Sequence, residues 1–184
     1  LIGKCIASAL DQDLPPEEYE VIVVDDGSTD GSLAAAQRAA CGHANVQVHA
    51  KPNEGVSMAR NYGTERAAGR YVMYGDADDY LSPGVLGRLT QIMDRERLDM
   101  LCFDMAGVDE HGGDLPLWSD GLFARGGGEV QSGRDFLRRD CFLPMACAYV
   151  YDRTMLERHG LGMLPMRHED EEFTPRAIYF AKRI

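Results

Sequence analysis

The chain has 184 residues, of which 45% are hydrophobic and 27% charged, and its 30 acidic and 19 basic residues give a formal charge of −11. This length suits one domain with a buried core. The negative charge excludes a nucleic-acid-binding surface, which needs a basic footprint, and simple electrostatic docking on an anionic membrane.

Helix and strand signals alternate along the first 105 residues. Helices are expected where apolar residues recur three and four positions apart, and strands where short runs are wholly apolar or alternate with polar residues. This alternation predicts an α/β domain with a mainly parallel sheet. The expected helices span residues 2–11, 32–40, 57–68, 82–98, 132–140, 154–159 and 169–183, and the expected strands span 20–24, 46–48, 71–74, 100–105 and 146–151.

The strand expected over 71–74 ends in an acidic cluster formed by Asp76, Asp78 and Asp79. In an extended segment Asp76 and Asp78 project to the same side. Two carboxylates on one side suit a hard cation such as Mg²⁺ or Mn²⁺, which also binds phosphate. A solvated turn is the alternative, since Asp is common in turns.

A second acidic pair, Asp25 and Asp26, follows the strand expected over 20–24. Because ligands of parallel sheets bind beyond the carboxyl ends of the strands, the two clusters are expected to meet over one crevice. An EF-hand interpretation of this segment fails, since Gln37 stands where the loop needs a bidentate Glu. The sequence also contains no P-loop, no dinucleotide-binding glycine motif and no nucleophile elbow.

A third acidic group, Glu169 to Glu172, follows His168. Acidic residues favour the positive end of a helix dipole, so a charged helix start is one interpretation. The other makes one carboxylate a general base. Lys51, Arg60 and Arg176 are candidates for phosphate contacts, although a single basic residue is usually only solvated.

The five cysteines are scattered, with no CxxC pair. This pattern indicates reduced thiols in a cytoplasmic protein and does not favour a zinc motif. Residues 107–130 are rich in Gly and turn formers and are interpreted as a long surface segment carrying Trp118. Trp118 is a candidate for stacking on a bound ligand, and the alternative role is a loop anchor.

Three segments, in this order and spacing, resemble the family 2 nucleotide-sugar glycosyltransferases of GT-A fold: EVIVVDDGSTDGS (20–32), NEGVSMARNYGTERAAGRYVMYGDADDYLSPG (53–84) and HEDEEFTPR (168–176). The resemblance implies a Rossmann-like, mainly parallel sheet flanked by helices. It also implies a single glycosyltransferase domain over 1–184, with a nucleotide-sugar-binding half (1–105) and an acceptor and catalytic-base half (106–184).

The resemblance also assigns roles to individual residues. Asp78 would contact the metal directly, with Asp76 toward the ribose or the metal, and Asp170 of the Glu169–Asp170 pair would be the catalytic base. The nucleotide-sugar pocket would be lined by Asp25, Asp26, Asn53, Gly55, Ala59, Arg60 and Asn61, and Arg176 would contact a diphosphate or the acceptor.

The implied reaction is an inverting, Mn²⁺- or Mg²⁺-dependent transfer of a sugar from a nucleoside-diphosphate sugar to a glycan, lipid-linked or other hydroxyl acceptor. UDP is the commonest nucleotide of the family, and surface polysaccharide assembly is its usual setting, in the cytoplasm or at the inner face of the membrane. Membrane association would need segments beyond this sequence. The alternatives are a sugar-phosphate nucleotidyltransferase and an inactive nucleotide-sugar-binding module.

The sequence departs from the family at both ends. It begins at Leu1 with a helix, whereas family members begin with an apolar strand and a Pro-x-Tyr-Asn-like turn. That strand lies centrally in a GT-A sheet, so its absence is expected to leave a gap with unpaired backbone groups. The sequence also ends at Ile184 without a stop signal, and we expect it to be part of a longer protein.

Overall fold

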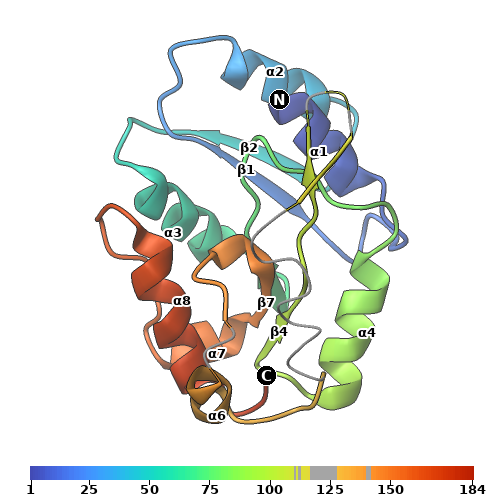
Figure 1. Ribbon diagram of the computed structural model, residues 1–184. Coiled ribbons are helices and arrows are strands. Elements are labelled where there is room, and N and C mark those ends of the chain that lie inside the picture. Colours follow the sequence, from blue (N-terminus) through green and yellow to red (C-terminus); the bar gives the residue numbers. More distant parts are fainter. Residues whose placement is uncertain (110, 112, 117–127, 140–141) are drawn as a thin grey trace.

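The computed structural model describes residues 1–109, 111, 113–116, 128–139 and 142–184. Its elements follow the predicted order (Figure 1). The helices are α1 (Ile2–Leu10), α2 (Ser32–Ala40), α3 (Val56–Arg66), α4 (Leu86–Glu96), α6 (Gly133–Arg138), α7 (Arg153–Arg158) and α8 (Glu169–Phe180), with a 3-10 helix η1 (Ala146–Ala148). The strands are β1 (Val21–Asp25), β2 (Val46–Ala50), β3 (Tyr71–Met73), β4 (Met100–Cys102), β5 (Gly107–Val108), β6 (Asp114–Leu115) and β7 (Tyr149–Asp152).

The strands form separate sheets. β1 and β2 pair in parallel, from Val21 opposite Val46 to Asp25 opposite Ala50. β7 lies between β3 and β4 and runs antiparallel to both. Within the described residues, no ladder joins the β1–β2 pair to the β3–β7–β4 sheet. The predicted α/β fold with a parallel sheet and flanking helices is confirmed, with one antiparallel strand at the centre of the second sheet.

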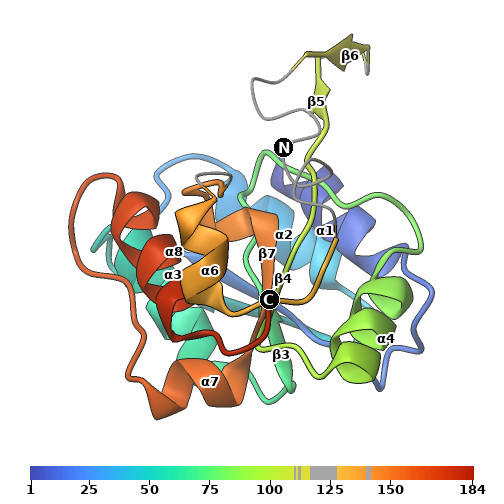
Figure 2. The ribbon, with the colours of Figure 1, turned by 60° about the horizontal axis from the view of Figure 1, so that its bottom comes forward.

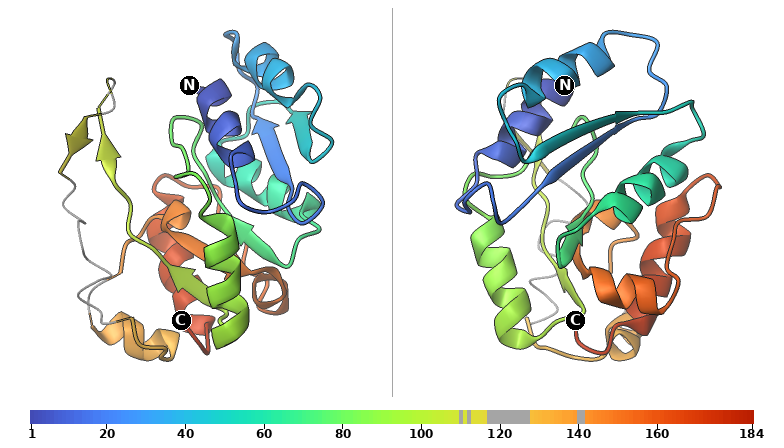
Figure 3. Two further views of the ribbon diagram at one scale, coloured as in Figure 1. Left: turned by 90° about the vertical axis from the view of Figure 1, so that its right-hand side faces the viewer. Right: turned by 180° about the vertical axis from the view of Figure 1, so that it is seen from behind.

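Helices cover both faces of the β1–β2 pair. α1 and α2 lie on one side and α3 on the other (Figures 1 and 3). α3 packs against β1 at Gly63, where a Cβ would lie in ordinary contact with Cγ2 of Val24, at 3.5 Å. Just after α3, the Glu20 carboxylate accepts the N–H groups of Ala68 and Gly69 at 2.7 and 3.1 Å. The strand and the helix that the sequence predicted here therefore pack against each other.

The core is organised around β7, whose four residues are all buried. Its side chains alternate between two faces, as in any strand. Val150 packs with Met93 and Leu98 beside α4, whereas Tyr149 and Tyr151 join the larger cluster formed with α6, α7 and α8. β7 is thus the central strand on which the α8 side of the molecule is assembled.

α4 begins at Leu86, four residues later than the Ser82-Pro83 pair predicted. Its first turn is capped from another part of the chain. Gln12 accepts the N–H groups of Val85 and Leu86, and Asp13 accepts that of Gly87 at 2.8 Å. A tertiary cap of this kind leaves no local signal in the sequence.

Within the segment predicted to be a surface loop, β5 and β6 form a hairpin that projects from the body (Figures 2 and 3). Trp118 lies outside the described residues. Among the residues that are described, no helix has the length and apolar character needed to cross a membrane.

Candidate active site

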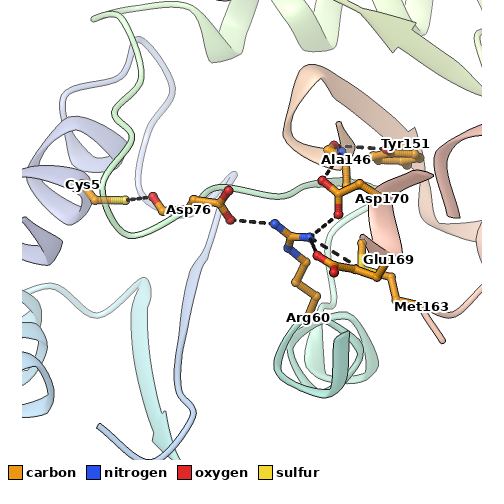
Figure 4. Close-up of polar contacts among 8 residues, drawn as sticks. All are labelled: Cys5, Arg60, Asp76, Ala146, Tyr151, Met163, Glu169 and Asp170. Atoms are coloured by element: carbon orange, nitrogen blue, oxygen red, sulfur yellow. Dashed lines mark hydrogen bonds and ion pairs between the residues drawn. The ribbon is translucent and has the colours of Figure 1, made fainter. Parts of the chain in front are cut away.

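Arg60 on α3 joins three carboxylates from two other parts of the chain (Figure 4). Its Nη2 donates to Asp76 at 2.7 Å, in the segment that follows β3. Its Nη1 donates to Glu169 at 2.8 Å and to Asp170 at 2.7 Å, in the first turn of α8. The structure therefore brings together residues that the sequence analysis assigned to the nucleotide, metal and catalytic-base regions.

The carboxylates around Arg60 outnumber its single positive charge. Burial lowers the pKa of Arg60, but its pairing with Asp76 and Asp170 outweighs burial and raises the pKa above the usual value. Burial, and then the neighbouring Asp170, raise the pKa of Glu169. The side chain of Arg60 is 11% exposed, so this compensation takes place with little help from water. A site with surplus negative charge of this kind attracts a cation.

Both oxygens of Asp170 are held by hydrogen-bond donors. Oδ1 accepts from Arg60, and Oδ2 accepts the N–H of Ala146 at 3.2 Å. The carbonyl of Ala146 in turn accepts from the buried hydroxyl of Tyr151 at 3.1 Å. Residues 146–148, predicted to begin a strand, form η1 instead, which places this N–H against Asp170. Because every residue type except proline carries a backbone N–H, the sequence could not point to Ala146.

The approach to α8 is fixed from α3. The side chain of Asn61 accepts the N–H of Met163 and donates to its carbonyl, both at 2.8 Å. His168, directly before α8, has a left-handed backbone with φ of 56°. Four acidic residues then occupy the first turn of α8, where the helix dipole favours negative charge. The sequence analysis assigned Asn61 to the nucleotide pocket, and in the structure its side chain holds the backbone of Met163.

Asp26 organises the loop between β2 and α3. Its Oδ1 accepts from Nζ of Lys51 at 2.7 Å and from the N–H of Glu54 at 3.0 Å, and its Oδ2 accepts the N–H of Gly55 at 2.7 Å. Burial raises the pKa of Asp26, but these donors, led by Lys51, outweigh burial and lower it. A carboxylate oxygen has two lone pairs, so Oδ2 keeps one acceptor position for a ligand.

Backbone geometry brings Asn53 against the turn after β1. Gly27 has φ of 76°, and a Cβ there would lie 2.8 Å from the backbone nitrogen of Asn53. Asp25 is buried and accepts the N–H of Ser28 at 3.2 Å. The side chains of Asp25 and Asp26 thus both shape the loops at the end of β1.

An open groove of about 490 Å³ lies between the start of α3 and the segment leading into α8. One wall is Glu54–Ser57, at the start of α3, and the other is Pro165–Glu169, leading into α8. The loop held by Asp26 and the residue next to Asp170 therefore border the same space.

The segment after β3 offers hard oxygen donors. Asp78 is exposed and forms no hydrogen bond or ion pair with any described residue, whereas Asp76 is paired with Arg60. Burial, followed by the charges of Asp76 and Asp78, raises the pKa of Asp79. Crowded carboxylates with an unpaired member suit Mg²⁺ or Mn²⁺, so the residues present fit the metal that the resemblance implies.

Arg176 is engaged elsewhere on α8. It pairs with Glu172 at 2.7 Å and donates to the carbonyl of Gly162 at 2.6 Å. Among the described residues, no contact joins it to the carboxylates held by Arg60.

The sequence is similar to those of known glycosyltransferases. A model of glycosyl transferase family 2 matches residues 1–159. The glycosyltransferase EpsJ of Bacillus subtilis is 38% identical over 100 residues, which cover 54% of this chain and 28% of that protein. The glycosyltransferase YibD of Escherichia coli is 30% identical over 175 residues, covering 89% of this chain and 49% of that protein.

The fold matches solved structures of TarS from Staphylococcus aureus. TarS 1–349 in complex with UDP has a TM-score of 0.81 at 26% identity, covering 100% of this chain and 52% of that one. The complex of the same protein with UDP-GlcNAc has a TM-score of 0.79 at 27% identity. TarS carries the name poly(ribitol-phosphate) β-N-acetylglucosaminyltransferase.

The chain spans about half or less of the length of these relatives. Glu169 and Asp170 lie beyond the residues that the family model matches, so their link to the rest of the site rests on Arg60. Since the family model covers most of the sequence, the chain belongs to glycosyl transferase family 2.

Proposed function

We propose that this chain transfers a sugar from a UDP-sugar to an acceptor hydroxyl, with inversion at the anomeric carbon and Asp170 as the general base. One observation carries the proposal. Arg60 contacts Asp76 and Asp170 at 2.7 Å each, so the segment proposed to hold the metal and the proposed base lie on either side of one guanidinium.

The proposed binding of the UDP-sugar rests on the polar groups near the start of α3. Asp26 keeps an acceptor position for a nucleobase N–H, and Asn53 and Gly55 border the loop that it holds. The UDP and UDP-GlcNAc complexes of TarS support UDP as the nucleotide. The open groove beside Glu54–Ser57 has a volume of about 490 Å³, within the size range of small-ligand sites.

Asp78 and Asp76 would hold Mn²⁺ or Mg²⁺. When bound, the cation would supply positive charge to the leaving diphosphate as a Lewis acid. Arg60, which stays protonated, would add fixed positive charge beside Asp76.

Asp170 would accept the proton of the attacking hydroxyl. The N–H of Ala146 and the guanidinium of Arg60 fix both of its oxygens, which favours the ionised form and a constant orientation. Glu169, whose pKa is raised, would position Arg60 from the other side. The transition state would be oxocarbenium-like, as in glycoside hydrolysis.

A glycan or lipid-linked hydroxyl is the proposed acceptor, in surface polysaccharide assembly on the cytoplasmic side of the membrane. The name of TarS, which acts on poly(ribitol phosphate), supports an anionic or polyol acceptor.

Two measurements test the proposal. Thermal unfolding with UDP and Mn²⁺ should show a higher midpoint, because a ligand at a hundredfold its Kd stabilises the folded state by about 2.7 kcal/mol. UDP release from UDP-sugars should then rise when an acceptor is added. UDP binding without release would favour an inactive nucleotide-sugar-binding module. Pyrophosphate release from UTP and a sugar phosphate would identify a nucleotidyltransferase.

A further inference from the structure

A cysteine from another part of the chain faces the acidic segment after β3. Sγ of Cys147, in the middle of η1, and carboxylate oxygens of Asp76 and Asp79 all lie within 4.8 Å of one another. In a tetrahedral zinc site, bonds of about 2.3 Å to sulfur and 2.1 Å to oxygen place the ligand atoms roughly 3.5 Å apart. Asp79 is exposed, so its side chain is free to rotate the remaining distance.

The thiol of Cys147 is buried. The residue is 7% exposed, and its sulfur makes no hydrogen bond with any residue that the structure describes. Cys5, on the other side of the same segment, differs in this respect, because its thiol donates to the carbonyl of Asp76 at 3.4 Å. Packing of Cys147 in the core does not by itself explain why its thiol lies beside the carboxylates of Asp76 and Asp79.

The negative charges of Asp76 and Asp79 beside this thiol are only partly balanced by positive side chains. Among the described residues, Arg60 provides the ion pair to Asp76, and it shares its charge with Glu169 and Asp170. Asp79 forms no ion pair within the described part of the chain. A divalent cation between the two aspartates would relieve their repulsion.

We propose that Asp76, Asp79 and Cys147 form a site for a thiophilic divalent cation, with Zn²⁺ as the ion that suits one thiolate and two carboxylates. Three protein ligands leave a fourth position open to water or an anionic oxygen. The proton of the thiol passes to solvent as the ion binds. The cysteine spacing gives no sign of this site, since its ligands come from segments about 70 residues apart.

The binding of Zn²⁺ does not depend on the proposed transferase activity. If that activity is present, Zn²⁺ and the catalytic Mn²⁺ or Mg²⁺ would compete for Asp76, and Zn²⁺ would inhibit transfer. The binding test therefore uses no nucleotide, so that its failure is distinguishable from failure of the proposed function.

The test is a titration of the purified chain with Cd²⁺, followed by the thiolate-to-cadmium charge-transfer absorption, and with Zn²⁺ in competition with a chromophoric chelator. Cys147→Ser should abolish the charge-transfer band and weaken Zn²⁺ binding at least tenfold. Cys41→Ser removes an exposed thiol and is the matched control, which should leave both signals unchanged. A band of equal size in Cys147→Ser would overturn the proposal.

Asp79→Asn provides an independent test if Cys147→Ser does not fold. This exposed substitution keeps the thiol and removes one ligand charge, so Zn²⁺ affinity should fall at least tenfold, while the charge-transfer band should return at higher Cd²⁺. Unchanged Zn²⁺ affinity in Asp79→Asn would also overturn the site.

Discussion

Arg60 and Asp170 are separated by 110 positions in the sequence, and Nη1 of one lies 2.7 Å from Oδ1 of the other. Nη1 also contacts Glu169 and Nη2 contacts Asp76, so one planar guanidinium holds three carboxylates from two segments. A lysine could not reproduce this geometry, since its ammonium is a single point charge. Arg60 thus connects the two halves of the site.

Replacing Arg60 by Met should destabilise the fold. The side chain of Arg60 is 11% exposed, and its removal would leave three mutually repelling carboxylates without a counter-charge. Removing one partner of a buried pair costs about 3–5 kcal/mol, and we expect about 2–3 kcal/mol here because Asp76 is 42% exposed. Urea unfolding at neutral pH measures the loss. Arg38→Met, at an exposed position of α2, is the control and should change stability by less than about 0.5 kcal/mol. Equal effects of the two substitutions would show that Arg60 is not a stabilising bridge.

Glu169→Gln should make stability less dependent on pH. Burial and Asp170 raise the pKa of Glu169, so the folded state disfavours its charged form. The folded protein therefore binds this proton more tightly than the unfolded chain, and stability is lost as pH rises from the unfolded value of about 4.5 through the raised folded pKa. Gln keeps an acceptor for Arg60 and has no charge to lose. The variant should gain stability relative to wild type between pH 4.5 and 7, measured by urea unfolding, and a constant difference across this range would contradict the assignment.

Much of this site could be predicted from the sequence because its polar residues follow strands. β1 ends at Asp25 and β3 ends three residues before Asp76, as the apolar runs indicated. The contacts that join these ends depend on tertiary structure. No local pattern indicates that Ala146 donates to Asp170, that Asn61 binds the backbone of Met163, or that Cys147 faces Asp76.

Some boundaries of helices and strands likewise depend on tertiary contacts that local sequence patterns do not indicate. The sequence correctly placed α2, which is rich in Ala, and the central part of α3, although the apolar periodicity of α3 is weak. The sequence prediction failed at the start of α4, where the cap comes from Gln12 and Asp13, and at η1, where Ala146 is hydrogen-bonded to Asp170 and Tyr151. Pro175 lies within α8 because its neighbours on that helix are packed in the core.

Gly27→Ala should destabilise the loop that carries Asn53. Its φ of 76° is strained for any residue with a Cβ, and the added carbon would lie 2.8 Å from the Asn53 nitrogen. The expected cost is about 1–3 kcal/mol, with weaker UDP binding because the loop must move. Gly31→Ala is the matched control, since a Cβ there meets nothing within 4 Å and φ is −80°. Thermal unfolding and UDP titration of both variants check the prediction, which is wrong if the two behave alike.

Asp170→Asn should separate catalysis from binding. The substitution removes the proposed base but keeps the size of the side chain, so transfer should fall about 10²–10⁴-fold, the usual contribution of general base catalysis. UDP affinity should stay within about threefold, because the proposed nucleotide contacts lie near Asp26 and α3. Steady-state UDP release and UDP titration by calorimetry measure the two quantities separately.

Glu171→Gln is the control for that substitution. Glu171 is exposed in the same turn of α8, so this substitution removes the same amount of negative charge from the helix start as Asp170→Asn does. Unlike Asp170, Glu171 does not contact Arg60 or Ala146. Transfer by Glu171→Gln should remain close to wild type. Because both oxygens of Asp170 accept hydrogen bonds, the new amide must place its NH₂ against a donor, and urea unfolding should register this as a loss of about 1–3 kcal/mol. If transfer and UDP affinity fell in parallel in the folded Asp170→Asn protein, Asp170 would be a binding residue, and the base would have to be sought elsewhere in the site.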